Sequence, residues 1–151
     1  MKRISSKATV YLVDGSNFSR SFQEPRAFSA GPAAGGRGGG DELETEFLDW
    51  LDSVSRLELL GASCFRVVFD GGFRSVRRLS NPAVNIYFSE HESADELLLE
   101  RACFLAMEGV RCLIVSNDRE IREKSAGENI MSMPCDVFYR LCEAELKKSR
   151  K

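Results

Sequence analysis

The sequence contains only one histidine among its 151 residues, which limits the chemistry that the chain can carry out. Zinc sites of the H-E-x-x-H type and cages with several histidines are excluded, and Ser-His-Asp or Cys-His catalysis is disfavoured. The five cysteines form no C-x-x-C pair and lie in or beside apolar segments. We therefore expect free, buried thiols in a reducing cytosol, not disulfides or a zinc site. Carboxylates and hydroxyls remain as catalytic groups.

The sequence also lacks a strong charge excess and a long apolar run. It has 21 basic and 23 acidic residues, so its formal net charge is −2. A nucleic-acid partner must therefore be held by a local basic patch. Apolar runs such as residues 10–13 and 112–115 are far shorter than the roughly 20 residues of a membrane span. No apolar segment typical of a secretion signal follows the basic start. We expect one cytoplasmic domain over residues 1–151, with no membrane partner.

Short apolar runs, rich in β-branched and aromatic residues, alternate with helical patterns. Strands are predicted over residues 9–13, 64–69, 84–88, 110–115 and 129–133. Helices are predicted from Asp41 to Gly61 and over 93–107, 118–125 and 135–146, whereas 17–28 is ambiguous. Residues 30–40 are predicted to form a flexible glycine-rich loop, and residues 147–151 a frayed basic tail. The alternation predicts an α/β fold: a three-layer αβα sandwich around a mainly parallel sheet of about five strands.

Acidic residues follow the inner strands of this predicted sheet. Asp14 and Asp70 end the first two strands. Asp95 lies in the first turn of the helix after the third strand, and Asp118 follows the fourth. Because parallel strands present their carboxyl ends at one edge, these acids are expected to lie close together. Carboxylates in such proximity need a counter-charge, and Mg²⁺ or Mn²⁺ suits hard oxygen ligands. Such an ion can activate water for phosphodiester hydrolysis.

Each acid also has a purely structural explanation. Asp14-Gly15 and Asp70-Gly71-Gly72 are good turn sequences. Ser93 and Glu96 form a capping box, and Glu120 suits the first turn of a helix after Asn117. Taken singly, each acid is better explained by its turn or cap. The repetition of an acid after every inner strand nevertheless favours a metal site.

Four segments together resemble known nucleases. Residues 10–17 (VYLVDGSN) look like the opening strand and D-G-x-N signature of NYN domains, a branch of the PIN-like nucleases. Residues 67–71 (VVFDG) are similar to the second-strand motif of YacP-type NYN proteins and flap-type nucleases. Residues 92–100 (ESADELLLE) and 115–120 (VSNDRE) resemble two further motifs of the YacP-like branch. The motifs occur in the right order and span nearly the whole chain.

The resemblance implies a metal-dependent endoribonuclease with a PIN-like αβα sandwich. Asp14, Asp95 and Asp118 would be the ligands of Mg²⁺ or Mn²⁺. Asn17 would position the first acid or the phosphate. Asp70 would be an additional ligand or would support the others.

Cations near these acids are candidate contacts for RNA phosphates. They are Arg74, Arg77 and Arg78 after Asp70, Arg119 and Arg122 beside Asp118, and Arg37 in the glycine-rich loop. A solvated arginine face is the alternative for each of them. Phe73 can stack on a base, although a place in the core or as a loop anchor is favoured. His91 is expected to be an exposed side chain near the site.

Two other functions remain open. One is an RNA- or ribosome-binding module without catalysis, with messenger RNA on the ribosome as a candidate partner. The other is a phosphatase of the haloacid-dehalogenase type, suggested by Phe69-Asp70-Gly71. That class needs D-x-D-x-[TV] at the end of the first strand, and Ser16 stands at the second aspartate position. The nuclease interpretation is favoured because every acid of the proposed site is present.

Overall fold

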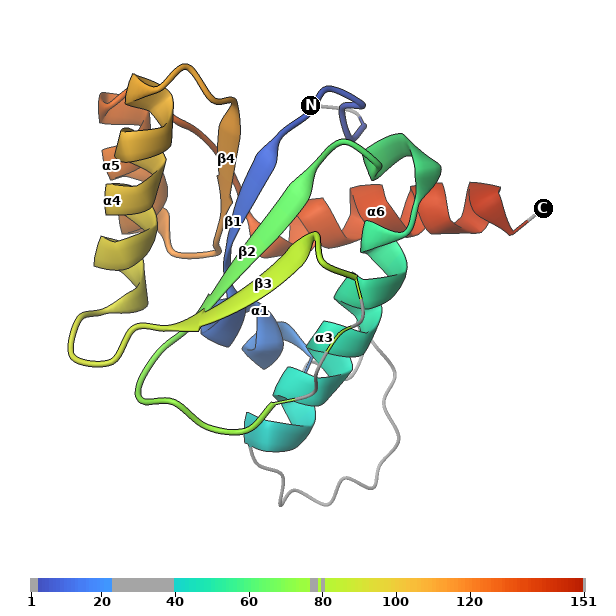
Figure 1. Ribbon diagram of the computed structural model, residues 1–151, viewed down its shortest axis with the longest axis horizontal. Helices are drawn as coiled ribbons and strands as arrows, with labels where there is room; N and C mark the ends of the chain where they lie inside the picture. The colour runs from blue at the N-terminus through green and yellow to red at the C-terminus, as the bar shows by residue number, and fades with distance from the viewer. Residues whose placement is uncertain (1–2, 23–39, 77–78, 80, 151) are drawn as a thin grey trace.

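The computed structural model describes residues 3–22, 40–76, 79 and 81–150, without the side chains of residues 40 and 41. Its five strands form one sheet in the order β3-β2-β1-β4-β5, and all neighbouring strands are parallel. The strands are β1 (Val10–Asp14), β2 (Cys64–Phe69), β3 (Val84–Phe88), β4 (Cys112–Val115) and β5 (Met131–Met133). The central strand β1 ends at the lower edge of the sheet in Figure 1.

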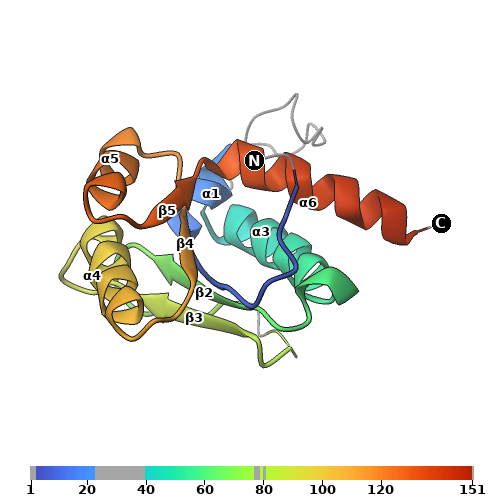
Figure 2. The same cartoon turned by 90° about the horizontal axis from the view of Figure 1, so that it is seen from above.

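Helices cover both faces of this sheet (Figure 2). On one face lie α1 (Gly15–Ser21), α3 (Gly40–Ser55) and α6 (Cys135–Ser149), and on the other α4 (Ala94–Met107) and α5 (Arg119–Gly127). The first group buries Phe18, Phe47 and Phe138, and the second buries Leu98 and Ile121. The sheet is thus covered on both faces, which explains why β1 and β4 are almost continuously apolar. The predicted three-layer sandwich is confirmed.

Some predicted element bounds were wrong. The helix expected from Asp41 to Gly61 begins at Gly40 and ends at Ser55. Asn81 Nδ2 donates hydrogen bonds to the Ser55 carbonyl oxygen at 3.3 Å and to its Oγ at 2.9 Å. These contacts occupy the end of the helix, and a separate 3₁₀ turn, η2 (Glu58–Leu60), precedes Gly61. This contact joins segments 26 residues apart, so local sequence signals did not reveal it.

Other element bounds moved by a few residues. The ambiguous segment 17–28 contains the end of α1, and the fifth strand begins at Met131 instead of residue 129. Residues 147–149 continue α6 and do not form a frayed tail, because Lys147 and Lys148 interact favourably with the carboxyl end of a helix. Residues 30–39, and with them Arg37, lie outside the described residues, as do Arg77, Arg78 and Lys151.

The cysteines agree with the expectation from the sequence. All five are free, and Cys112, Cys135 and Cys142 are buried, whereas Cys64 and Cys103 are half-buried. Among the described helices, none has the length and apolar character needed to cross a membrane.

The turn from β1 into α1 depends on the absence of a side chain at Gly15. A Cβ atom added there would lie 2.7 Å from both Val67 Cγ1 and Phe69 Cε1. These two side chains of β2 are fully buried, so neither can move away at low cost. The close approach therefore lets α1 begin immediately after Asp14, beside β2.

Replacing Gly15 with alanine should destabilise the protein, although alanine favours helices. The added methyl group overpacks the contact with β2, and we expect the free energy of unfolding in urea to fall by about 1–3 kcal/mol. The control is Gly127→Ala at the end of α5, where an added Cβ meets nothing within 4 Å. Its stability should be unchanged or higher by up to about 1 kcal/mol. Equal unfolding midpoints for the two variants would contradict the packing argument.

Candidate active site

Two aspartates cap helices that follow the inner strands. Asp14, the last residue of β1, accepts a hydrogen bond at Oδ1 from the Asn17 backbone N at 3.1 Å. Asp118, just after β4, accepts one at Oδ1 from the Glu120 backbone N at 2.9 Å. These bonds satisfy free N–H groups at the starts of α1 and α5. Cap chemistry thus places both carboxylates at the carboxyl edge of the sheet.

The other two aspartates are connected through the start of α4. Asp70 follows β2, and its Oδ1 accepts a hydrogen bond from the Ala94 backbone N at 2.9 Å. Ala94 is the first residue of α4, so this bond holds the helix that carries Asp95 against the end of β2. The Asp70 backbone N donates to Ser16 Oγ at 2.8 Å, which ties the same loop to α1.

Ser116 bridges the first and the last of these acids. Its buried Oγ donates a hydrogen bond to Asp14 Oδ2 at 3.2 Å and accepts one from the Asp118 backbone N at 3.1 Å. Both oxygens of Asp14 therefore have a hydrogen-bond donor. The bridge fixes the orientation of Asp14 and the distance between the ends of β1 and β4.

The electrostatics of Asp14 reflect this confined position. Burial raises the pKa of Asp14 to about 6, and the negative charge of Asp70 adds to the increase. Hydrogen bonds from Asn17 and Ser116 and the positive charge of Arg20 oppose it. Since charges shift a neighbour's pKa mainly over short distances, Asp70 and Arg20 lie near Asp14.

Asp95 completes the group. The pKa of Asp95 is raised to about 7, and burial is the largest cause. A hydrogen bond with Asp118 and the negative charges of Asp14, Asp118 and Asp70 also raise it. The four predicted acids therefore act on one another at one edge of the sheet. We call Asp14, Asp70, Asp95 and Asp118 the acid cluster.

The acid cluster is not arranged around a common centre. Within residues 3–22, 40–76, 79 and 81–150, no three His, Cys, Asp or Glu side chains form a group that could hold a metal ion. The chemistry of the ligands nevertheless fits a hard divalent cation, since all are carboxylates and a cation would remove the repulsion between them.

Asn17 connects three segments behind the acid cluster. Its Oδ1 accepts a hydrogen bond from the Asn117 backbone N at 2.7 Å and one from Cys135 Sγ at 3.6 Å. Asn117 Oδ1 in turn accepts a bond from the Cys135 backbone N at 2.8 Å. The side-chain oxygen of Asn17 thus joins the ends of β1 and β4 to the start of α6.

Arg74 lies at the predicted edge, but its donors are used within the protein. Its guanidinium pairs with buried Glu44 at 2.7 Å and donates to the carbonyl oxygens of Asp70 at 3.1 Å and Gly72 at 2.8 Å. The partner on α3 is 30 residues away in sequence, so sequence reasoning did not find it. Arg74 therefore anchors the loop after β2, and a contact between Arg74 and a phosphate stays a prediction.

Three other arginines lie near the acid cluster. Arg119 is exposed and forms a weak surface pair with Glu123 at 3.3 Å. Arg122 Nε is buried and has no hydrogen-bond partner among the described residues. Burial raises the pKa of the Cys135 thiol, and the positive charge of Arg122 partly opposes this increase. Arg20, on α1, was not among the predicted phosphate contacts, and nothing in its local sequence distinguishes it.

Comparison with known proteins finds similarity in the fold. No protein-family model matches the chain, and no curated protein matches it. Similar solved structures are Rae1 (YacP) from Bacillus subtilis and its W164L mutant, with TM-scores of 0.67 and 0.66. Identity is 17% in both cases, and each match covers 93% of this chain and 77% or 78% of the other. The chain thus has a YacP-like fold, in agreement with the resemblance of its motifs.

Replacing Asp95 with asparagine should stabilise the protein at neutral pH in the absence of divalent cations. The folded-state pKa of Asp95 is raised from 3.8 to about 7, so the stability that its protonated form contributes is lost as pH rises through that range. Asparagine cannot ionise, and its amide can still donate to Asp118. We expect a melting temperature at pH 8 in EDTA that is higher by about 2–4 °C, and little difference at pH 4.

Asp52→Asn on α3 is the matched control for this experiment. Asp52 pairs with exposed Arg56 at 3.3 Å, so its replacement should change the melting temperature little at either pH. A lower melting temperature for Asp95→Asn at pH 8 would show that the carboxylate is not strained by its neighbours.

Proposed function

We propose that this protein is a metal-dependent endoribonuclease of the NYN type, which hydrolyses phosphodiester bonds in RNA. The observation that carries the proposal is the acid cluster at the carboxyl edge of a parallel sheet, where burial and the charges of neighbouring acids raise the pKa of Asp14 and of Asp95. The YacP-like fold and the four short motifs that resemble those of NYN domains support it.

The acid cluster is the proposed binding place for Mg²⁺ or Mn²⁺. Asp14, Asp95 and Asp118 would hold the ion, and Asp70 would be a further ligand or would support them through the start of α4. When bound, the cation supplies an activated water and neutralises charge on the phosphate. Because the ligands of a cation must be deprotonated and the pKa of Asp95 is raised to about 7, binding should become tighter as the pH rises through that value.

Groups of the chain itself hold and orient the reacting partners. Ser116 and the Asn17 backbone donate to Asp14 and fix its carboxylate. Arg20 lies near Asp14, and Arg119 and Arg122 follow Asp118. We assign these three arginines to the phosphates of the RNA, where they supply the local positive charge that a chain of net charge −2 otherwise lacks.

A phosphatase is less consistent with the site. The second aspartate that the haloacid-dehalogenase pattern requires is replaced by Ser16, and Ser16 Oγ accepts the hydrogen bond from the Asp70 backbone N. Asp70 also lies on the loop after β2, whereas that pattern places its acids at the end of the first strand. The residues are thus present in the wrong positions for that reaction.

An RNA-binding module without catalysis is the second candidate. The observation that favours it is the absence, among the described residues, of three ligands already arranged for a metal ion. A protein of this kind would bind RNA equally well with and without divalent cations.

Replacing Asp14 or Asp118 with asparagine should abolish cleavage of single-stranded RNA in Mn²⁺. Even residues that only support a metal ligand contribute about 10–100-fold, so loss of a proposed ligand should reduce the rate by about 100-fold or more. Asparagine still caps a helix, which separates loss of activity from loss of folding. The measurement is the cleavage rate of labelled RNA with Mn²⁺ and with EDTA, alongside the melting temperature of each variant.

Asp52→Asn is again the control and should cleave at the wild-type rate. Cleavage that persists in both the Asp14 and the Asp118 variants would refute the assignment of the site. RNA retention without cleavage in Mg²⁺ or Mn²⁺ would favour the binding module.

A further inference from the structure

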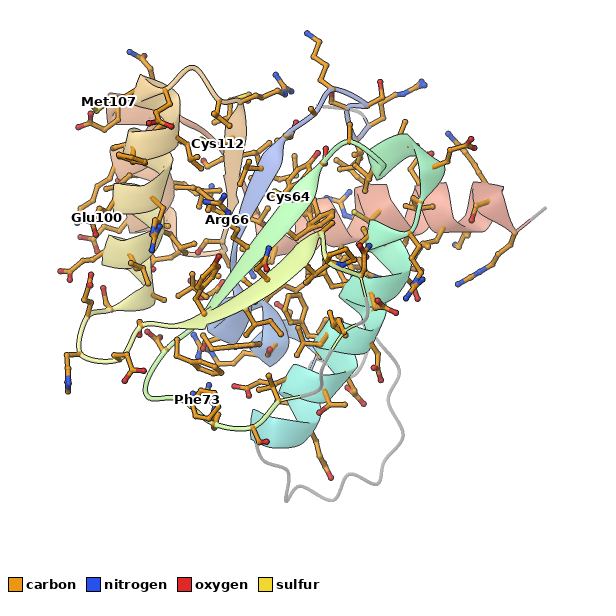
Figure 3. All side chains as sticks on the ribbon, viewed as in Figure 1. Cys64, Arg66, Phe73, Glu100, Met107 and Cys112 are labelled. Atoms are coloured by element: carbon orange, nitrogen blue, oxygen red, sulfur yellow. The ribbon has the colours of Figure 1, made fainter. Side chains whose placement is uncertain are left out.

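Phe73 is exposed to an unusual degree for an aromatic side chain. Its exposed fraction is 77%, although large apolar residues are normally buried. It follows Asp70 by three residues on the loop after β2. Cys64 and Cys112 are the first residues of β2 and β4, and Figure 3 shows Phe73 at the opposite edge of the sheet, where these strands end. The ring therefore lies at the edge of the sheet where the acid cluster lies.

The loop that carries Phe73 is held firmly on both sides. Arg74 bonds to the carbonyl oxygens of Asp70 and Gly72 and lies 5.0 Å from the centre of the Phe88 ring. Phe73 itself contacts Phe88 in an edge-to-face arrangement, with ring centres 5.4 Å apart and planes at 75°. Its position is thus fixed by the loop and by one ring contact, while most of its surface remains free.

The surroundings of Phe73 suit a small planar ligand better than a protein. Gly71, Gly72 and Ser75 are exposed neighbours without large side chains, and a Cβ added to Gly72 would meet nothing within 4 Å. A single exposed ring among such residues is too small an apolar area for a protein interface. It leaves room for a nucleotide backbone to pass close to the loop.

Two other exposed apolar residues, both on α4, lack this combination. Phe104 and Met107 lie on α4, and Met107 is near the end of that helix farthest from the acid cluster (Figure 3). Phe73 differs because it is close in sequence and in the fold to a proposed phosphate-cleaving site.

We propose that Phe73 stacks on an unpaired base of the RNA at the edge of the sheet where the acid cluster lies. The inference rests on the proposed nuclease function. Base–aromatic stacking tolerates any sequence, because every base has a flat face. Bases within a duplex are already stacked on their neighbours, and one would have to leave the helix to reach the ring. Phe73 thus selects for unpaired RNA without reading its sequence.

The test compares wild-type protein with Phe73→Ala, Phe73→Trp and Phe104→Ala. Binding of fluorescein-labelled oligouridine, free or annealed to oligoadenosine, is measured by anisotropy in Ca²⁺, and cleavage is measured separately in Mn²⁺. Phe73→Ala should weaken binding of the free strand by about 5- to 100-fold and leave duplex binding unchanged. Phe73→Trp should bind the free strand at least as tightly as wild type, and Phe104→Ala should match wild type.

A second readout reports stacking directly. Fluorescence of 2-aminopurine placed in the oligouridine should be quenched by wild-type protein and much less by Phe73→Ala. Phe73 is so exposed that alanine there should leave the melting temperature nearly unchanged.

The outcomes separate this proposal from the function on which it rests. Equal single-strand affinity for wild type and Phe73→Ala, with cleavage intact, would overturn stacking and leave the nuclease. Loss of binding in Phe73→Ala without any cleavage by wild type would support stacking and overturn the nuclease. If wild type binds no RNA, both proposals are wrong.

Discussion

Parallel pairing of β1 with β2 on one side and β4 on the other determines where Asp14, Asp70 and Asp118 lie. In this arrangement Asp14 pairs in register with Val68, and Val13 pairs with Val115. The connections that follow the three strands therefore begin at one edge. Each connection needs a polar residue to turn or to cap the next helix, and here that residue is an aspartate. A structural requirement of the backbone thus gathers negative charge in one place.

The negative charge of the acid cluster is unfavourable for the folded protein when no cation is bound. Burial and mutual repulsion raise the pKa of Asp14 to about 6 and that of Asp95 to about 7. Hydrogen bonds from Ser116 and the Asn17 backbone hold Asp14 in place despite this cost. Strain of this kind persists at functional sites, where binding of a ligand relieves it. It is the physical reason to expect that a cation, and not a further hydrogen bond, completes the site.

The sequence was sufficient for the fold and for the acid cluster, because both depend on local patterns. Apolar runs that end in Asp14 or Asp70 indicate strands and the turns after them. It was not sufficient for contacts between distant segments: Ser116 reaches Asp14 across 102 positions, and Glu44 reaches Arg74 across 30. For the same reason the pairing of Arg74 with Glu44 was not predicted. The exposure of Phe73 likewise depends on how the loop packs against Phe88.

The most direct test of the central claim is anomalous diffraction from crystals soaked in Mn²⁺ near pH 8. We expect a manganese peak coordinated by carboxylate oxygens of Asp14, Asp95 and Asp118, with the hydrogen bond between Asp95 and Asp118 broken. Crystals that diffract well and show no manganese at the acid cluster, or an unbroken contact between those two residues, would contradict it.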